Sequence, residues 1–333
     1  MQEGLNATIL ITGGAGYIGS HTTQVLLNEG YKCVVIDNLS SGYIEALPPG
    51  AILAKGDLRD EKFVSEVFAK HQPKAVVHFA AKHVLPQSLV EPLFFYENNL
   101  MGLLHLLKSC QRYDVRHFVF SSTAAIYGEI SGAELVHEDR PKNPLNPYGQ
   151  SKLMCEQILK DTQRVMPLNF AILRYFNVAG AAVDLTNGQR LERGTNLIKV
   201  LAEVAVGARS VFEIYGDDYP TPDGTCIRDY IHVQDLADVH ALALKALFEK
   251  KDSFTVNCGY GRGSSVAEVL ASFEKILGHS LPKKILARRA GDAPQVVADV
   301  RRLRDLLGWK PLRDDLELIC RTSLDWERKK LNA

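Results

Sequence analysis

A tyrosine and a lysine four residues apart, Tyr148 and Lys152, stand in the first turns of a predicted helix that begins NPYGQSK. Residues at this spacing share one helix face, so the ammonium can act on the phenol. A nearby cation favours the phenolate and lowers the pKa of the phenol, ordinarily about 10. Cations are disfavoured at a helix start, where the dipole is positive. The pair therefore predicts a tyrosine base assisted by lysine; the alternative is a solvated surface lysine.

A glycine-rich loop, TGGAGYIGS at 12–20, lies between the first predicted strand and the first predicted helix. Gly14, Gly16 and Gly19 match the pattern G-x-G-x-x-G. With Gly13 in place of Gly14, the loop also matches G-x-x-G-x-x-G. Glycines here allow a tight turn and bring the backbone close to a pyrophosphate at the helix start. The loop predicts a dinucleotide site; the alternative is a tight turn without a ligand.

Two aspartates follow the next two predicted strands. Asp37 ends the second strand, 21 residues after Gly16, where this fold places the carboxylate that binds the adenosine ribose. That carboxylate would repel a 2′-phosphate, and 38–50 contains no Arg or Lys, so NAD is favoured over NADP. Asp57 follows the third strand and is either a contact for the adenine edge or a strand-end or helix-cap aspartate.

The fifth predicted strand ends in three hydroxyl residues, Ser121, Ser122 and Thr123. Ligands of open α/β folds bind beyond the carboxyl ends of the strands. A side-chain hydroxyl at this edge of the sheet can therefore hydrogen-bond a substrate alcohol. The alternative is a polar end to a buried strand.

The elements that must position these residues alternate along the chain. Strands are predicted at 7–12, 32–38, 51–57, 74–80, 117–122 and 168–177, and helices at 17–30, 61–70, 91–112 and 148–165. Continuous apolar strands that alternate with helices indicate a parallel sheet covered on both faces, a doubly wound α/β fold.

The pattern becomes irregular after about residue 178. Further helices are predicted at 196–207, 235–249, 264–277, 301–308 and 313–330. We predict a Rossmann-type NAD domain over 1–178, to which 229–256 returns, and a smaller, mixed C-terminal substrate lobe over 179–228 and 257–333.

Composition narrows the class of protein. The chain has 39 basic and 39 acidic residues, so no global field points to nucleic acid or to an anionic membrane. The six cysteines lack metal-ligand spacing, and we expect reduced core thiols and no metal. Apolar runs stay short of the roughly 18 residues that span a bilayer, and the start lacks a leader pattern. We expect a cytoplasmic protein.

Together these motifs resemble the extended short-chain dehydrogenase/reductases, which combine T-G-G-x-G-Y-I-G, S-S-T and Y-x-x-x-K. Four segments are similar, within that family, to the UDP-glucose 4-epimerases: NPYGQSKLMCEQIL (146–159), RYFNVAGA (174–181), YGDDYPTPDGTCIRDYIHVQDLAD (215–238) and RRAGD (288–292). The similarity extends over essentially the whole chain.

The resemblance implies an NAD-dependent isomerase that interconverts UDP-glucose and UDP-galactose through a transient 4-keto sugar. Tyr148 would be the catalytic base and acid, Lys152 its electrostatic partner and a ligand of the nicotinamide ribose, and Thr123 the catalytic hydroxyl. A homodimer built from the helices near 91–112 and 148–165 is also implied.

The resemblance also implies two sets of binding residues. For NAD they are Gly13, Gly16, Tyr17, Ile18, Gly19, Asp37, Asn38, Asp57, Leu58, Phe79, Ala80, Ala81, His83, Asn98, Tyr148, Lys152 and Tyr175. For the UDP-sugar they are Thr123, Tyr148, Asn177, Asn196, Leu197, Tyr215, Arg228, Arg289, Asp292 and Val296. Arginine suits this second role, because its planar fork matches phosphate oxygens.

Three positions depart from the pattern of the family. Thr123 stands where serine is frequent, and it keeps the hydroxyl. His83 stands where a lysine is common near the cofactor. Val296 stands where many glucose-preferring members have tyrosine. Because valine is smaller, we expect room for an N-acetyl group beside the sugar, and hence activity on the N-acetylhexosamine pair.

Other functions remain alternatives. Nucleotide-sugar 4,6-dehydratases and decarboxylases typically carry acidic residues directly after S-S-T, whereas Ala124, Ala125 and Ile126 follow here, which disfavours them. A 4-epimerase for UDP-pentoses or UDP-uronic acids stays open. A non-catalytic NAD-binding sensor is a distant alternative, because it need not keep Tyr148 and Lys152 together with a strand-end hydroxyl.

Overall fold

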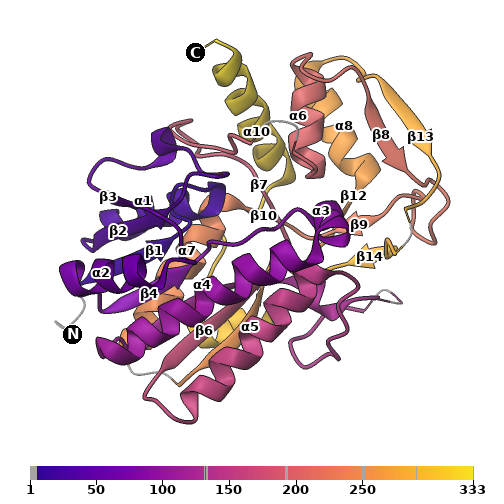
Figure 1. Cartoon of the computed structure of the whole chain (residues 1–333). Helices are drawn as coiled ribbons and strands as arrows, with labels where there is room; N and C mark the ends of the chain where they lie inside the picture. The colour runs from indigo at the N-terminus through magenta and orange to yellow at the C-terminus, as the bar shows by residue number, and fades with distance from the viewer. Residues whose placement is uncertain are drawn as a thin grey trace. The chain divides into compact units, whose positions relative to one another are not determined.

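The computed structural model describes residues 6–130, 132, 134–191, 194–249, 252–289 and 291–332 (Figure 1). By its internal contacts the chain divides into two compact units. The first unit comprises Met1–Gly128, Pro141–Arg174 and Ala237–Val256, and the second comprises Glu129–Arg140, Tyr175–Leu236 and Asn257–Ala333. The domain boundaries predicted from the sequence remain a prediction; the contact units differ from them chiefly in grouping 129–140 with the second unit.

Within the described residues, the first unit is built on a seven-stranded sheet in the order β11-β6-β5-β4-β1-β2-β3. The strands are β1 (Thr8–Thr12), β2 (Lys32–Asp37), β3 (Ile52–Lys55), β4 (Ala75–His78), β5 (His117–Thr123), β6 (Asn169–Tyr175) and β11 (Phe254–Cys258). The ladders that join β3, β2, β1, β4 and β5 are parallel. The doubly wound sheet predicted from the sequence is confirmed. Its order reverses beside β1, where such folds bind ligands.

Helices cover the two faces of this sheet. They are α1 (Tyr17–Asn28), α2 (Glu61–His71), α4 (Pro92–Arg112), α5 (Pro147–Gln163) and α7 (Val233–Phe248), whereas the short α3 (Leu85–Val90) contacts α4 and α5. On one face α2, α4 and α5 enclose Phe118 and Phe120 of β5, which are completely buried. Figure 1 shows α4 and α5 lying side by side there. On the other face the Phe248 ring of α7 contacts His117 of β5. Burial on both sides explains the continuous apolar strands.

Short strands make up the mixed second unit. β7 (Asn177–Ala179) pairs in parallel with β10 (Tyr230–His232), and β8 (Phe212–Tyr215) with β13 (Lys283–Leu286). β9 (Ile227–Arg228) pairs with β12 (Ser264–Ser265) on one side and with β14 (Gln295–Val296) on the other. Its helices are α6 (Leu197–Ala205), α8 (Val266–Leu277), α9 (Arg301–Leu307) and α10 (Leu316–Leu331). The smaller, mixed C-terminal region expected from the sequence is confirmed.

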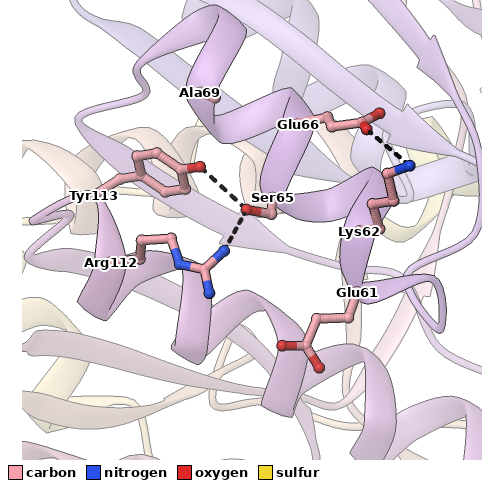
Figure 2. A pocket seen from close by; sticks show the side chains of 7 residues that line it. All are labelled: Glu61, Lys62, Ser65, Glu66, Ala69, Arg112 and Tyr113. Carbon is pink, nitrogen blue, oxygen red and sulfur yellow. Dashed lines mark hydrogen bonds and ion pairs between the residues drawn. The ribbon is translucent and has the colours of Figure 1, made fainter.

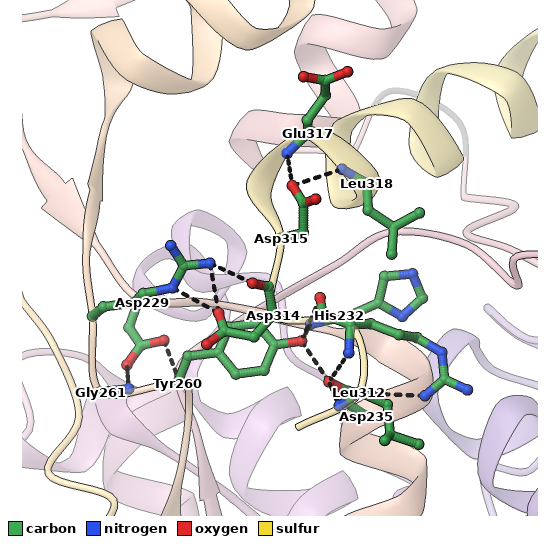
Figure 3. Close-up of polar contacts among 12 residues, drawn as sticks. Asp229, His232, Asp235, Tyr260, Gly261, Leu312, Asp314, Asp315, Glu317 and Leu318 are labelled. Carbon is green, nitrogen blue, oxygen red and sulfur yellow. Dashed lines mark hydrogen bonds and ion pairs between the residues drawn. The ribbon is translucent and has the colours of Figure 1, made fainter. Parts of the chain in front are cut away.

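Two buried carboxylates hold the second unit together (Figure 3). Asp229 is completely buried and accepts hydrogen bonds from the backbone N–H groups of Tyr260, at 2.8 Å, and Gly261, at 2.9 Å. Burial raises the pKa of Asp229 to about 6, although these bonds work in the opposite direction. Asp235 accepts from the Tyr260 hydroxyl at 2.8 Å and from Arg313 Nη1 at 2.7 Å. Both carboxylates therefore serve as internal anchors.

Cysteine side chains lie inside the protein. All six are buried, as predicted for core residues. Burial raises the pKa of Cys155 to about 12, so this thiol is protonated at neutral pH. Among the helices that the structure describes, none is long and apolar enough to cross a membrane.

Candidate active site

The glycine loop connects β1 to α1 and lies against the end of β4. Gly13 has a φ of +70°, and a Cβ on it would come within 2.7 Å of the Ala80 backbone nitrogen. A Cβ on Gly14 would come within 2.8 Å of the Val35 side chain, and one on Gly19 would overlap the Gly13 carbonyl oxygen. The turn is therefore closed to larger residues. Because β1 and β4 flank the reversal of strand order, the loop stands at the switch point of the sheet.

The start of α1, within the described residues, has no side-chain cap. Gly16 is the N-cap, and within this described segment no side chain caps the helix and its first turn holds no acidic residue. The N–H groups of Tyr17 and Ile18 belong to the first turn of the helix. The helix dipole adds a partial positive charge. A loop that admits close approach, followed by an uncapped helix start, fits the pyrophosphate of a dinucleotide.

Asp37 is placed to serve as the ribose ligand predicted from the sequence. Its carboxylate is 8% exposed and accepts hydrogen bonds from the N–H groups of Ala15, at 3.0 Å, and Leu39, at 2.8 Å. These bonds hold it beside the glycine loop at the carboxyl end of β2. A carboxylate fixed there fits the hydroxyls of an adenosine ribose.

Asp57 is paired within the chain. It accepts from Arg59 Nε and Nη2, each at 3.0 Å, and from the Asn38 amide at 2.9 Å. The hydrogen bonds from Arg59 hold the pKa of Asp57 below its ordinary value. Leu58, its neighbour, is buried against α4 and α2. The helix-cap interpretation of Asp57 is wrong, because Asp60 caps α2; Asp57 anchors the loop after β3, and a contact with the adenine edge stays a prediction.

The segment after β4 runs along the same edge of the sheet. The Phe79 ring lies 4.7 Å from the His240 ring of α7, measured between centroids. The Ala80 N–H donates to the Thr12 carbonyl oxygen at 3.1 Å. Ala81 and His83 follow in the stretch that leads to α3. The predicted NAD residues of β1, β2 and β4 thus gather at one edge.

Sequence reasoning missed two residues that hold this segment. Asn99 of α4 accepts from the Lys82 N–H at 2.8 Å and donates to the Ser151 hydroxyl of α5 at 2.9 Å. Lys82 in turn donates from Nζ to Ser40 Oγ at 3.0 Å, which places a cation beside the loop after β2. The predicted Asn98, next to Asn99, instead donates to the Phe94 carbonyl oxygen of its own helix at 2.7 Å. The sequence signal that could have identified Asn99 is its position directly after Asn98.

Tyr148 and Thr123 meet at the carboxyl end of β5. Asn146 caps α5 by accepting from the Gly149 N–H at 2.8 Å, which sets Tyr148 in the first turn. The Tyr148 phenol is half-buried and hydrogen-bonded to the Thr123 side chain. Burial raises the pKa of Tyr148 to about 12, and the bond with Thr123 opposes that rise. The chain by itself therefore keeps the phenol protonated at neutral pH.

Lys152 is not a surface lysine. Its side chain is 3% exposed, and Nζ donates to the Ser121 carbonyl oxygen at 2.8 Å and lies 4.8 Å from the centroid of the Phe120 ring. Burial lowers the pKa of Lys152 to about 8. The solvated alternative is thereby excluded. It is a desolvated cation one helical turn from Tyr148, and its action on the phenol stays a prediction.

The second unit gathers the predicted phosphate and sugar residues around β9. Arg228 donates from Nη1 to the Ala293 carbonyl oxygen at 2.8 Å, and its Nη2 lies 3.4 Å from Asp292 Oδ1. Val296 stands opposite Arg228 in the β14–β9 ladder. The Arg289 guanidinium lies 3.6 Å from the centroid of the Tyr215 ring. Two arginines are thus held by neighbouring groups of the same unit.

The remaining predicted residues begin or end elements of the second unit. Asn177 starts β7 and donates from its N–H to the Asp229 carbonyl oxygen at 2.9 Å. Asn196 is the N-cap residue of α6, and Leu197 is the first residue of that helix. Tyr175 is buried at the end of β6.

A surface hollow of about 430 Å³ lies elsewhere, on α2 and the end of α4 (Figure 2). Its polar groups bond to one another: Ser65 Oγ lies 3.1 Å from the Tyr113 hydroxyl and accepts from Arg112 at 3.0 Å. The hollow contains none of the predicted site residues among the seven that line it, and we assign it no role.

Comparisons with known proteins identify the family of the chain. Residues 9–259 match the model of the NAD dependent epimerase/dehydratase family. UDP-glucose 4-epimerase of Azospirillum brasilense is 47% identical over 327 residues, which are 98% of this chain and 94% of the relative. The solved structure of UDP-glucose 4-epimerase from Brucella ovis in complex with NAD is similar with a TM-score of 0.93, at 41% identity, over 96% of this chain and 98% of that one. The UDP-Glc/GlcNAc 4-epimerase from Campylobacter jejuni gives a TM-score of 0.86, at 44% identity, over 97% and 100%.

Replacement of Asp37 by alanine tests the ribose ligand. We expect Asp37→Ala to weaken NAD binding roughly 10- to 100-fold, because a charge-assisted hydrogen bond contributes about 1.5–3 kcal/mol. The ratio of NAD affinity to NADP affinity should decrease as well. Calorimetric titration of NAD-free protein with each dinucleotide measures both effects.

Asp60→Ala is the matched control, since Asp60 also accepts from a backbone N–H, that of Phe63 at 3.0 Å, but caps α2. It should cost about 1 kcal/mol of stability and leave NAD affinity unchanged. Wild-type affinity in Asp37→Ala would refute the assignment.

Proposed function

The chain belongs to the NAD dependent epimerase/dehydratase family, and on that premise we propose that it is an NAD-dependent 4-epimerase of UDP-sugars. It interconverts UDP-glucose and UDP-galactose through a transient 4-keto sugar. The observation that carries the proposal is the pairing of Tyr148 with Thr123 at the carboxyl end of β5, one helical turn from the buried Lys152. The names of the relatives, UDP-glucose 4-epimerases at 40–47% identity, support this substrate.

In this proposal Tyr148 is the residue that transfers the proton. As the phenolate it removes the proton of the sugar 4-hydroxyl, and as the phenol it later returns that proton, while Thr123 hydrogen-bonds the same sugar oxygen. Bound NAD supplies a hydride acceptor and a positive charge. Because burial raises the pKa of Tyr148 to about 12, we expect the phenolate to depend on nearby cations, and the chain contributes Lys152. Lys152 is charged below its pKa of about 8 and loses this influence at higher pH.

Nucleotide binding falls to the second unit. Arg228 and Arg289 are held by Asp292 and Tyr215 respectively, so their guanidinium groups are fixed before a ligand arrives. Fixed planar donors suit the oxygens of a diphosphate. With Asn177, Asn196 and Leu197 they are proposed to hold the UDP while the sugar turns.

Exposed apolar side chains bear on the assembly of the protein, and buried thiols bear on its location. Side by side, α4 and α5 expose Met101 (39%), Leu104 (37%) and Met154 (39%), an apolar surface suited to a second copy of the chain. We therefore infer a homodimer. Six buried thiols suit the reducing cytoplasm.

Removal of the Tyr148 hydroxyl tests the reaction. We expect Tyr148→Phe to retain NAD but to lose about 10²- to 10⁴-fold in turnover, the usual contribution of a general base. Products formed from UDP-galactose are quantified by chromatography. Tyr113→Phe, the same change in the hollow of Figure 2, should be unaffected.

Near-normal turnover by Tyr148→Phe would contradict the assignment. The same assay on the wild type separates the alternatives. A 4-epimerase yields UDP-glucose without net NADH, a dehydratase yields a stable keto sugar, and a sensor yields no product.

Val296 generates a prediction about substrate range. We expect wild-type protein to interconvert UDP-N-acetylglucosamine and UDP-N-acetylgalactosamine. Val296→Tyr should lower the ratio of N-acetyl to plain hexose turnover about 10-fold or more, because a larger side chain beside Arg228 reduces the room for the substituent. Turnover of a panel of UDP-sugars gives the ratio. An unchanged ratio would show that Val296 does not set the size limit.

Charges placed on the apolar surface test the homodimer. We expect the double variant Met101→Glu and Met154→Glu to sediment as a monomer at micromolar concentration, because unpaired carboxylates would be buried at the interface. Sedimentation velocity measures the state. Leu312→Glu, which changes a residue of the second unit that is 76% exposed, should remain dimeric. A wild-type monomer, or a dimeric double variant, would refute the surface.

A further inference from the structure

A third residue continues the line of Tyr148 and Lys152 along α5. Glu156 follows Lys152 by four residues, so it lies on the same helix face, and its side chain is completely buried. An isolated buried carboxylate is costly, and it requires a partner. Arg174 of β6 supplies one: Nε lies 2.9 Å from Oε1 and Nη2 lies 2.7 Å from Oε2. Such a bidentate pair fixes both side chains.

The same carboxylate also binds the end of β5. Ser122 Oγ donates to Glu156 Oε1 at 2.7 Å. The two neighbours of Ser122 are the partners of the proposed catalytic residues: the Ser121 carbonyl oxygen accepts from Lys152 Nζ at 2.8 Å, and Thr123 bonds to Tyr148. A shift of Ser122 would therefore displace both contacts.

Glu156 is also the anion that matters for the charge of Lys152. Burial lowers the pKa of Lys152, and Cys155 and Glu156 oppose that effect. The Cys155 thiol, with a pKa of about 12, is neutral in the working range. Desolvation and the Lys152 charge lower the pKa values of His78 and His83, so these imidazoles are neutral as well.

The other groups that face Lys152 carry no charge either. They are the Phe120 ring, the Ser121 carbonyl oxygen and, in the protein without bound NAD, the protonated Tyr148. The Glu156 carboxylate is thus the charged neighbour that favours the ammonium.

We propose that Glu156 is a positioning residue for the epimerase reaction. Its charge keeps Lys152 as an ammonium ion, and its hydrogen bond to Ser122 holds the end of β5 in place. Arg174 makes a buried carboxylate tolerable at this position. The proposal rests on the proposed function.

The test compares Glu156→Gln with the double variant Glu156→Gln/Arg174→Met. For each holoenzyme, turnover of UDP-galactose is measured against pH, and thermal unfolding is recorded. In Glu156→Gln we expect the alkaline limb of turnover to move down by about one pH unit, since Lys152 loses its proton more easily. Its unfolding temperature should fall, because Arg174 is left without its carboxylate partner.

The double variant separates the two roles. Removing both charges should restore most of the unfolding temperature while the alkaline limb stays shifted. Cys155→Ala, an adjacent buried change without a change of charge, should keep the wild-type limb. If the limb is unshifted in Glu156→Gln, or returns to the wild-type position in the double variant, the proposal is wrong. The wild-type profile is measured first: absence of turnover there would refute the proposed function itself.

Discussion

The burial of one ammonium group constrains the first unit more than any other interaction. A charged amine inside a protein is unfavourable unless its hydrogen-bond donors find acceptors and its charge finds an anion. Lys152 satisfies the first condition at the Ser121 carbonyl oxygen and through the Phe120 ring, both on β5. Because α5 packs on this strand, the same arrangement fixes Tyr148 one turn earlier. The lowered pKa of the lysine thus follows from packing, as does its place one turn from the phenol.

The proposed dinucleotide site depends on a different constraint, which is the absence of side chains at the glycine positions of the loop. A Cβ at Gly13 would strike the backbone after β4, and one at Gly19 would strike the loop itself. Small residues therefore let three strand ends converge beside an uncapped helix start. Asp37, anchored by Ala15 and Leu39, closes the loop on the side of β2. The local geometry of these described residues fits a preformed site.

The second unit shows how one motif combines binding with architecture. The segment 225–238, part of the longest stretch of resemblance, carries Arg228, which is proposed to bind phosphate. The same segment carries Asp229 and Asp235, whose carboxylates are occupied by backbone N–H groups and by Tyr260 and Arg313. The residues of this motif thus divide into proposed ligands and structural anchors. The hydrogen bonds of each side chain within the unit distinguish the two groups.

The sequence by itself determined the features that local chemistry encodes. Periodicity predicted the strands and helices of the main sheet, and residue spacing identified the glycine loop, Asp37 and the Tyr148–Lys152 pair. It did not predict the short helix α3 or the placement of Tyr230–His232 beside β7.

Tertiary structure decided the contacts between residues far apart in the chain. Lys82 meets Ser40 across 42 positions, Asn99 meets Ser151 across 52, and Ser122 meets Glu156 across 34. Such pairs depend on the order of the strands and on the packing of α4 and α5. No local pattern contains that order, because it results from how the whole chain buries its apolar surface.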